Sequence, residues 1–300
     1  MRRTSIILSA ILLTTYSCNT STPVILDEAA YIESHMQWQK DRLKSLKAKD
    51  GWLNLAGIYW LEEGSQTFGS DSANDIIFPS KAPAFIGTLT VENENVHLDV
   101  KEGAQIFYKN EPVQTLDLKP ERSGNQSYLS NGDLAWYIMK RNTSLAIRLR
   151  DYKNPALEAM DHIPGFPIDP AYVVEAELLP FEEVKTITVS TPFEGYTQDY
   201  DCPGELHFKL HGKNLQILPF ISGDDYFIII SDETSGIESY GAGRFMYVSP
   251  DSTGRIILDF NKAYNPPCAL TEFAACPMPP KENNLSIKIE AGEKMVSLHQ

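Results

Sequence analysis

Beyond Gly51, the sequence is a succession of short runs rich in Val, Ile, Leu and aromatic residues, separated by clusters of Gly, Pro, Asn and Asp. Such runs between turn-forming clusters are typical of strands that are buried on one face. The clearest runs span residues 87–91, 96–100, 105–108, 134–139, 145–149, 186–190, 205–210, 226–231, 244–248 and 255–260. Because no long helical pattern separates them, we predict a mainly β protein whose body is an antiparallel β-sandwich or barrel.

One amphipathic helix is expected before this β region, over residues 27–49. Its apolar residues recur three, four or seven positions apart, which is the spacing of one helix face. They are Ile25, Ala29, Ile32, Met36, Leu43 and Leu46. Asp27 is a suitable N-cap and Gly51 a suitable end. We therefore expect the apolar face of this helix to lie on the β body.

The first residues resemble a bacterial lipoprotein signal. Two arginines precede an apolar run that is too short to span a bilayer, and Cys18 follows the small residue Ser17. Thr15 departs from the lipobox pattern, because Leu is usual there. We expect a signal peptide over residues 1–17 and a lipidated tether over residues 18–26, hence a periplasmic lipoprotein of the bacterial cell envelope that is anchored to the membrane only through Cys18. The alternative is an ordinary secretory signal that is cleaved near a cysteine.

The remaining chain divides into four predicted segments. The N-terminal helix occupies residues 27–50, and a first β module follows over residues 51–150. A connection over residues 151–170 contains four prolines and little periodicity, which indicates a boundary. A second β module then extends over residues 171–300.

Composition narrows the functional class. The chain has 26 Lys and Arg against 40 Asp and Glu, a net charge of −14, which is unsuited to general nucleic-acid binding because phosphates require cationic partners. The sequence has no phosphate-binding Gly-rich loop, dinucleotide fingerprint or serine-nucleophile elbow. His207 and His211 lie about 13 Å apart on a predicted strand, too far to share one metal ion. We expect no cofactor, no metal and no nucleic-acid partner.

The cysteines indicate one disulfide. Cys268 and Cys276 are close in sequence and each is next to a proline, so in an oxidising compartment we expect them to pair. Cys202 is then left as an odd thiol.

The segment over residues 64–141 resembles the opening of a forkhead-associated domain. The matching residues are 64–70 (GSQTFGS) and 74–77 (NDII). This resemblance implies a β-sandwich. It does not imply phosphopeptide binding, because Ser70 replaces the expected arginine and the Ser-x-x-His motif is missing.

Most of the chain after Gly51 resembles the bacterial and archaeal domain-of-unknown-function family 1684. The matching motifs are residues 52–57 (WLNLAG), 60–61 (WL), 148–151 (RLRD), 165–169 (GFPID), Tyr240, 243–245 (GRF), 258–268 (LDFNKAYNPPC), 276–280 (CPMPP) and 291–294 (AGEK). The resemblance implies membership of the family and carries no activity, since the family has none assigned.

The densest polar motif follows residue 243. Counting back from a turn predicted over residues 249–254 places Arg244 opposite Asp259 on the neighbouring strand. Further polar side chains follow on a stiff, proline-bound segment: Asn261, Tyr264 and Asn265. We predict that this constellation binds a small polar or anionic ligand, with the arginine holding the anionic group. A plain cross-strand ion pair is the alternative.

A second basic motif lies on the strand predicted at residues 145–149. Arg148 and Arg150 are two residues apart and therefore share a face of the strand. Asp151 is the last residue of this strand. We assign Arg148 to the same ligand pocket as Arg244. The alternative is a solvated sheet face or a buried Arg–Asp pair.

Two other functions remain open. One is a hydrolase that uses a carboxylate, Asp151 or Asp259, with His162 as an acid–base group and the same arginines to stabilise negative charge. The other is a structural envelope protein that interacts with partners without a pocket.

Overall fold

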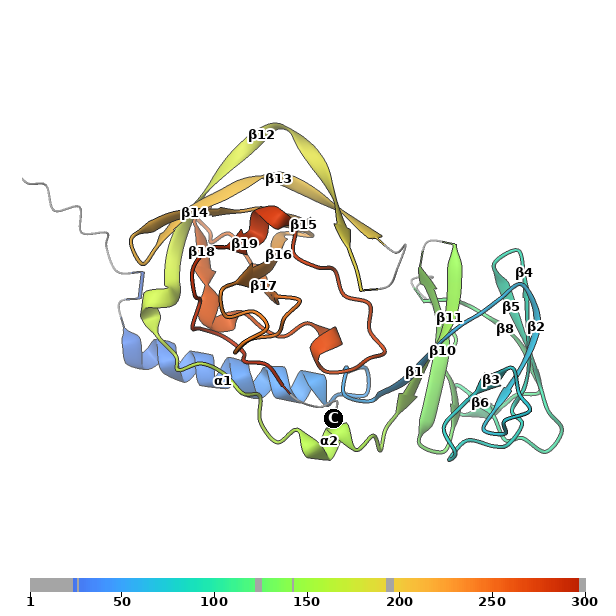
Figure 1. The fold of residues 1–300 in the computed structure, drawn as a ribbon. Coiled ribbons are helices and arrows are strands. Elements are labelled where there is room, and N and C mark those ends of the chain that lie inside the picture. Colours follow the sequence, from blue (N-terminus) through green and yellow to red (C-terminus); the bar gives the residue numbers. More distant parts are fainter. Residues whose placement is uncertain (1–23, 26, 122–125, 142, 193–196, 297–300) are drawn as a thin grey trace, which may run out of the picture.

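The computed structural model describes residues 24–25, 27–121, 126–141, 143–192 and 197–296; the expected signal peptide, Cys18 and most of the tether lie outside them. Two β-rich lobes lie side by side, and helix α1 (Glu28–Leu46) runs beneath the second lobe (Figure 1). The prediction of a mainly β, sandwich-like body with an N-terminal helix is confirmed. Within the described part of the chain, no helix is both long and apolar enough to cross a membrane.

The first lobe comprises residues 55–151. Its strands are β1 (Leu55–Trp60), β2 (Gly64–Gly69), β3 (Ile76–Ile77), β4 (Gly87–Glu92), β5 (Asn95–Val100), β6 (Phe107–Tyr108), β7 (Glu111–Pro112), β8 (Thr115–Leu118), β9 (Leu129–Asn131), β10 (Leu134–Arg141) and β11 (Ser144–Asp151). They form one sheet in the order β1-β11-β10-β9-β6-β7 and another in the order β3-β2-β4-β5-β8.

Alternating side chains give these two sheets a common core. In β5, for example, Val96 and Leu98 are buried, whereas Asp99 is exposed. Trp136 of the first sheet meets Phe68 of the second edge-on, with ring centroids 6.2 Å apart. The lobe is therefore a β-sandwich whose core lies between the sheets.

The second lobe comprises residues 173–285. Its strands are β12 (Val173–Ser190), β13 (Thr197–Leu210), β14 (Lys213–Ile217), β15 (Phe220–Ser222), β16 (Asp225–Asp232), β17 (Arg244–Val248), β18 (Ile256–Asp259) and β19 (Asn284–Leu285). They form sheets in the orders β14-β13-β12-β18 and β15-β16-β17, and β19 pairs with β16. The long β12–β13 hairpin bends across the top of this lobe in Figure 1, and its register shifts between Pro180 and Lys185.

Short helices connect and close the lobes. They are α2 (Ala156–Ala159), η1 (Pro170–Tyr172), η2 (Phe260–Lys262), η3 (Pro267–Ala269) and η4 (Lys281–Asn283). A small apolar cluster at the junction joins Leu46 at the end of α1 to Leu53, Met160 and Leu270. Cys268 and Cys276 lie within disulfide distance, with Cα atoms 6.0 Å apart.

Helix α1 begins as predicted, and only part of its predicted apolar face packs on the protein. The Asp27 side chain accepts a hydrogen bond from the Ala30 backbone at 3.0 Å, which is the expected N-cap. Met36, a member of the predicted apolar face, is 49% exposed, whereas His35 is buried. The Tyr31 hydroxyl donates to Asp259 at 2.8 Å. The docking face is thus polar and aromatic near Tyr31 and His35, whereas Leu43 and Leu46 of the predicted stripe pack in the apolar cluster at the end of the helix.

Candidate functional site

Arg244 does not pair with Asp259, which corrects the predicted register. Its strand β17 pairs with β16, whereas the strand of Asp259, β18, pairs with β12. The turn between them therefore joins two sheets, and it does not close a hairpin. Arg244 is 0% exposed and forms an ion pair with Asp232 at 2.6 Å. Burial lowers the pKa of Arg244, and the charge of Asp232 opposes that shift.

The Arg244 guanidinium is fully enclosed by the protein itself. It donates to the backbone oxygens of Ile289, at 3.0 Å, and Ala291. These contacts tie β17 to the C-terminal segment and leave no open side toward a ligand. The role that the structure supports for Arg244 is therefore to hold the second lobe together.

Asn261 likewise makes contacts that tie segments together. Its side-chain oxygen accepts a hydrogen bond from the Asp169 backbone N–H at 3.0 Å, and its amide donates to the Asp169 carbonyl at 2.9 Å. Asp259 accepts from the Asn261 backbone N–H at 3.1 Å as well as from Tyr31. This cluster fixes the connection between the lobes to α1 and to the end of β18.

Tyr264 and Asn265 face α1. The Arg42 guanidinium lies 4.4 Å from the centre of the Tyr264 ring and donates to the Asn265 carbonyl at 2.9 Å. Glu293 accepts from Arg42 at 3.1 Å and from the Asn265 backbone N–H at 2.6 Å. Burial raises the pKa of Glu293, and the positive charge of Arg42 opposes that shift. These residues lock α1 to the second lobe.

The groups of the predicted hydrolase do not meet. His162 is exposed and contacts its neighbour Asp161. Asp151 forms an ion pair with Lys81 in the first lobe, and Asp259 bonds to Tyr31 in the second. The three predicted catalytic candidates therefore lie in three separate environments.

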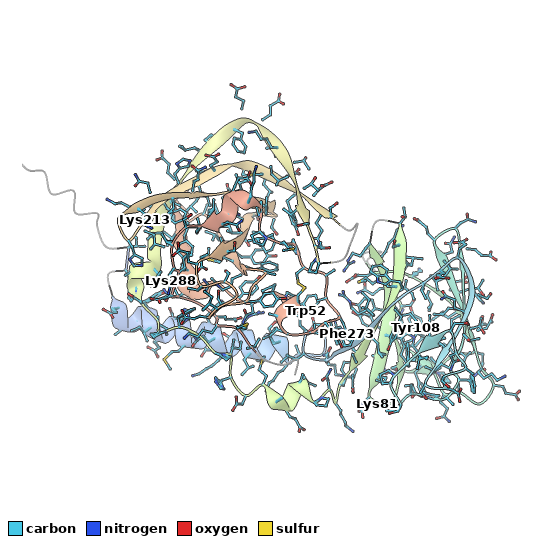
Figure 2. The ribbon with its side chains drawn as sticks, viewed as in Figure 1. Trp52, Lys81, Tyr108, Lys213, Phe273 and Lys288 are labelled. Atoms are coloured by element: carbon cyan, nitrogen blue, oxygen red, sulfur yellow. A yellow bond between two sulfur atoms is a disulfide. The ribbon has the colours of Figure 1, made fainter. Side chains whose placement is uncertain are left out.

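Arg148 is placed differently, because it lines a cavity of about 360 Å³ between the lobes. Arg244, Asn261, Tyr264 and Asn265 do not line this cavity, so the structure does not assemble the five predicted residues around one ligand. The lining residues are Trp52, Arg141, Arg148, Gln198, Tyr200, Ile221, Ser222, Phe227, Phe245, Tyr247, Pro267, Ala274, Ala275, Cys276 and Pro277. Figure 2 shows Trp52 at the junction of the lobes.

The environment of Arg148 is the most unusual feature of this cavity. The residue is 4% exposed, and its Nε is buried with no hydrogen-bond partner. The guanidinium carbon lies 5.6 Å from the centre of the Trp52 ring, and no hydrogen bond or ion pair to Arg148 is found among the described residues. The other lining arginine, Arg141, already binds Glu121 at 2.8 Å.

The register of the first sheet explains how Arg148 reaches the cavity. Leu149 faces the sandwich core, so Arg148 and Arg150 face the opposite side, as predicted. Arg150 already has partners there, because its Nη1 donates to the Gly51 carbonyl and to the Asn54 side chain, each at 2.6 Å, although its Nε has none. Of these two arginines, Arg148 is therefore the one without a hydrogen-bond or ion-pair partner in the described part of the chain.

The second lobe contributes an aromatic wall, defined as Tyr200, Phe227, Phe245 and Tyr247. The ring of Phe227 lies 5.0 Å from that of Phe245, 5.0 Å from that of Tyr247 and 5.9 Å from that of Tyr200. Sequence reasoning missed this wall. One sequence feature could have indicated it: Phe245 and Tyr247 are two residues apart on a predicted strand, so their rings lie on the same face.

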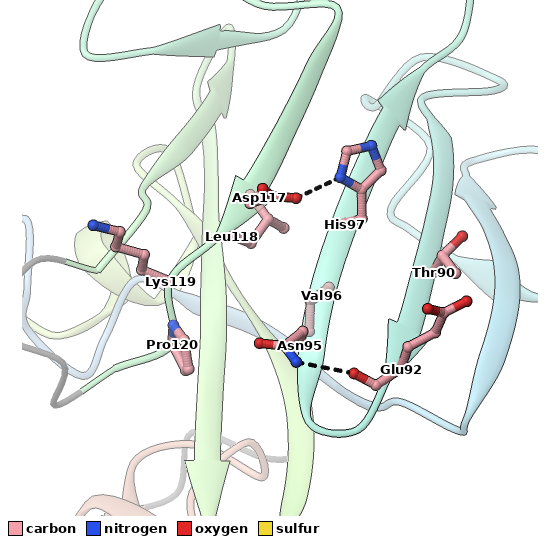
Figure 3. Close-up of a pocket in the computed structure, with 9 residues that line it drawn as sticks. All are labelled: Thr90, Glu92, Asn95, Val96, His97, Asp117, Leu118, Lys119 and Pro120. Carbon is pink, nitrogen blue, oxygen red and sulfur yellow. Dashed lines mark hydrogen bonds and ion pairs between the residues drawn. The ribbon is translucent and has the colours of Figure 1, made fainter.

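A second hollow, of about 660 Å³, lies on the outer surface of the first lobe between β4, β5 and β8 (Figure 3). His97 and Asp117 flank it, and the histidine Nδ1 lies 2.6 Å from the aspartate. The hydrogen bond to Asp117 raises the pKa of His97. The second ring nitrogen lies 2.9 Å from the Thr115 hydroxyl, so both nitrogens are occupied. We therefore favour the Arg148 cavity as the functional site.

The fold and this cavity define a two-lobed, mainly β protein with a cationic, aromatic-lined site between its lobes. The chain belongs to the family described as "Protein of unknown function (DUF1684)", whose match spans residues 158–294. The match is narrower than the predicted resemblance, because it includes the aromatic wall but not Trp52 or Arg148.

Solved structures that are similar to part of the chain include the following example. It is the solution NMR structure of an uncharacterised protein of Haloarcula marismortui, with 33% identity over 47% of this chain and 80% of that chain and a TM-score of 0.40. No curated protein matches the chain. None of these comparisons supports the resemblance to forkhead-associated domains.

Proposed function

We propose that this protein is a binding module that holds a small anionic ligand in the cavity between its lobes. The observation that carries the proposal is Arg148, which lines the cavity, is nine-tenths buried and has no hydrogen-bond or ion-pair partner among the described residues. A buried charge without a partner is costly, because it has lost water and gained no counter-charge. An anionic ligand supplies that counter-charge, and a guanidinium binds a carboxylate through two parallel hydrogen bonds.

The charge of the lining supports the same ligand class. Although the chain carries 40 acidic residues, none of the described residues that line the cavity is acidic. The two charged side chains among the described residues that line this site are both arginines, and Glu121 neutralises Arg141. The cavity is therefore a local positive region in an acidic protein, which favours and steers anions.

The test is thermal unfolding of the full chain, purified in detergent, with a panel of sodium salts of carboxylates, phosphate and sulfate. Binding of an anion is expected to raise the unfolding temperature of the wild type and not that of Arg148→Met. Arg255→Met is the matched control, because Arg255 is exposed and bound to Asp251. An equal shift in Arg148→Met, or no shift with any anion, contradicts the proposal.

We also propose that the protein acts in the bacterial cell envelope, anchored through a lipid on Cys18. The support is the short apolar run before Cys18 and the pair Cys268–Cys276, which suits an oxidising compartment. Cys18→Ala is expected to move the protein from the membrane fraction to the soluble fraction of cells. Retention of this variant in the membrane fraction would rule out the anchor.

A further inference from the structure

We infer that the ligand of the Arg148 cavity is a small aromatic monocarboxylic acid, with its carboxylate on Arg148 and its ring on the aromatic wall. This inference rests on the proposed function and adds the chemical class of the ligand. Three properties of the cavity support it: the one lining arginine without a partner among the described residues, the aromatic wall and the small volume.

The available charge sets the charge of the ligand. Arg148 is the lining arginine without a partner in the described residues, whereas Arg141 is bound to Glu121 and to the Lys140 carbonyl. One guanidinium matches one monoanionic group. A planar carboxylate also fits its fork of donors, and Trp52 covers the guanidinium at 5.6 Å and so restricts its orientation. A dianionic phosphate monoester would leave one negative charge uncompensated in this setting.

The aromatic wall sets the body of the ligand. Phe227 and Tyr247 are directly opposite each other on paired strands, and their rings are tilted by 32° with centroids 5.0 Å apart. Tyr247 is nevertheless 55% exposed, so much of its ring is not covered by the protein. Aromatic rings gain from packing against other aromatic rings beyond the area that they bury. An aromatic ligand would cover this exposed ring.

The volume of the cavity and its stiff wall at residues 274–277 limit the ligand to a short molecule. The volume of about 360 Å³ lies near the lower end of the range for small-molecule sites. Pro267, Pro277 and the Cys268–Cys276 pair stiffen the wall formed by residues 274–277. A single ring joined to a carboxylate by a short chain satisfies these limits, as in 3-phenylpropionate.

Isothermal titration calorimetry of the full chain with three probes tests this inference. The probes are 3-phenylpropionate, 3-cyclohexylpropionate and phenyl phosphate. The first two have the same charge and chain length and differ in ring type, so their ratio reports aromatic recognition. We expect 3-phenylpropionate to bind about threefold to tenfold tighter than the cyclohexyl acid, from the usual strength of aromatic pairing. We also expect it to bind tighter than phenyl phosphate.

Variants of Tyr247 test whether the aromatic wall causes the preference for 3-phenylpropionate over 3-cyclohexylpropionate. Tyr247→Ala is expected to remove the preference for the aromatic acid, and Tyr247→Phe to retain it because the ring remains. Phe85→Ala is the matched control, since it removes an exposed ring of the first lobe that does not line the cavity. Circular dichroism checks that each variant is folded.

The outcomes separate this inference from the proposed function. Equal binding of both acids, tighter binding of phenyl phosphate or an unchanged preference in Tyr247→Ala overturns the aromatic monocarboxylate and leaves anion binding at Arg148 in place. Failure of all three probes to bind overturns the inference. If the wider panel of anions also fails, the proposed function is overturned with it.

Discussion

Two buried arginines show that burial alone does not assign a role to a residue. Arg244 has an ion pair with Asp232 and backbone acceptors, so its charge is compensated inside the protein. Arg148 has the face of Trp52 and an open cavity. The first arrangement is typical of a structural ion pair, and the second is typical of a site that is completed by a ligand.

This contrast predicts opposite effects of the same substitution. Arg244→Met should destabilise the protein by about 3–5 kcal/mol, because it leaves the buried Asp232 carboxylate unpaired. Arg148→Met should change the free energy of unfolding by less than about 1 kcal/mol or increase it, because it removes an uncompensated charge. Urea unfolding of the two variants measures the difference. A loss in Arg148→Met as large as that in Arg244→Met would make Arg148 a structural residue.

At the scale of elements, helix α1 carries a titratable group into its interface with the second lobe. His35 is buried, and its Nδ1 has no hydrogen-bond partner in the structure. Burial lowers the pKa of His35, with a smaller opposing effect of the charge of Asp259. The folded state therefore holds this imidazole neutral at a pH where the unfolded chain begins to protonate it.

The lowered pKa of His35 predicts acid sensitivity of the folded state. Unfolded His35 takes up a proton below about pH 6.5, whereas folded His35 does not until a lower pH. Its contribution to stability is present above about pH 6.5 and is lost as the pH falls toward the lowered pKa. His35→Gln should thus lose less stability than the wild type between about pH 7 and pH 5 in urea unfolding. His162→Gln, which removes an exposed imidazole, should follow the wild type; parallel curves for His35→Gln would contradict the prediction.

The segment between Cys268 and Cys276 is a second element with a measurable role. A disulfide that closes so short a loop is expected to contribute about 2–3 kcal/mol in the chain-entropy model. The double variant Cys268→Ser, Cys276→Ser should lose that amount and should bind cavity ligands more weakly, because residues 274–277 form one wall. Peptide mapping without reductant should recover the two cysteines as a linked pair. Two free thiols at these positions would contradict the disulfide.

The positions of the strands along the sequence were easier to predict than which strands pair with each other. The alternation of apolar residues and the turn clusters predicted strands such as β5, β16 and β17 close to their observed bounds. The same local pattern could not show that β17 pairs with β16 while β18 pairs with β12, because pairing between distant strands depends on tertiary packing. Arg148 was therefore found from strand periodicity, whereas Trp52 and Tyr247 are brought to it by the placement of the lobes.

At the scale of the molecule, the site depends on both lobes, although each lobe has its own core. Among the described residues, two apolar clusters lie within the first lobe and two within the second, and a small cluster near Leu46 and Leu270 lies at the junction of the lobes. Arg148 comes from the first lobe and the aromatic wall from the second. A ligand held between them therefore binds only while both lobes are folded and docked.

This dependence predicts how a bound acid changes thermal unfolding. Because the cores are separate, we expect two transitions in differential scanning calorimetry of the ligand-free chain. Unfolding of the less stable lobe, whichever it is, destroys the cavity and releases the ligand. 3-Phenylpropionate at about 100 times its dissociation constant should therefore stabilise the less stable lobe by about 2.7 kcal/mol. The midpoint of the lower transition should rise toward that of the upper transition. The midpoint of the upper transition should stay unchanged. Arg148→Met should not show this shift of the lower transition, and a ligand that raised the upper transition alone would place the binding site within one lobe.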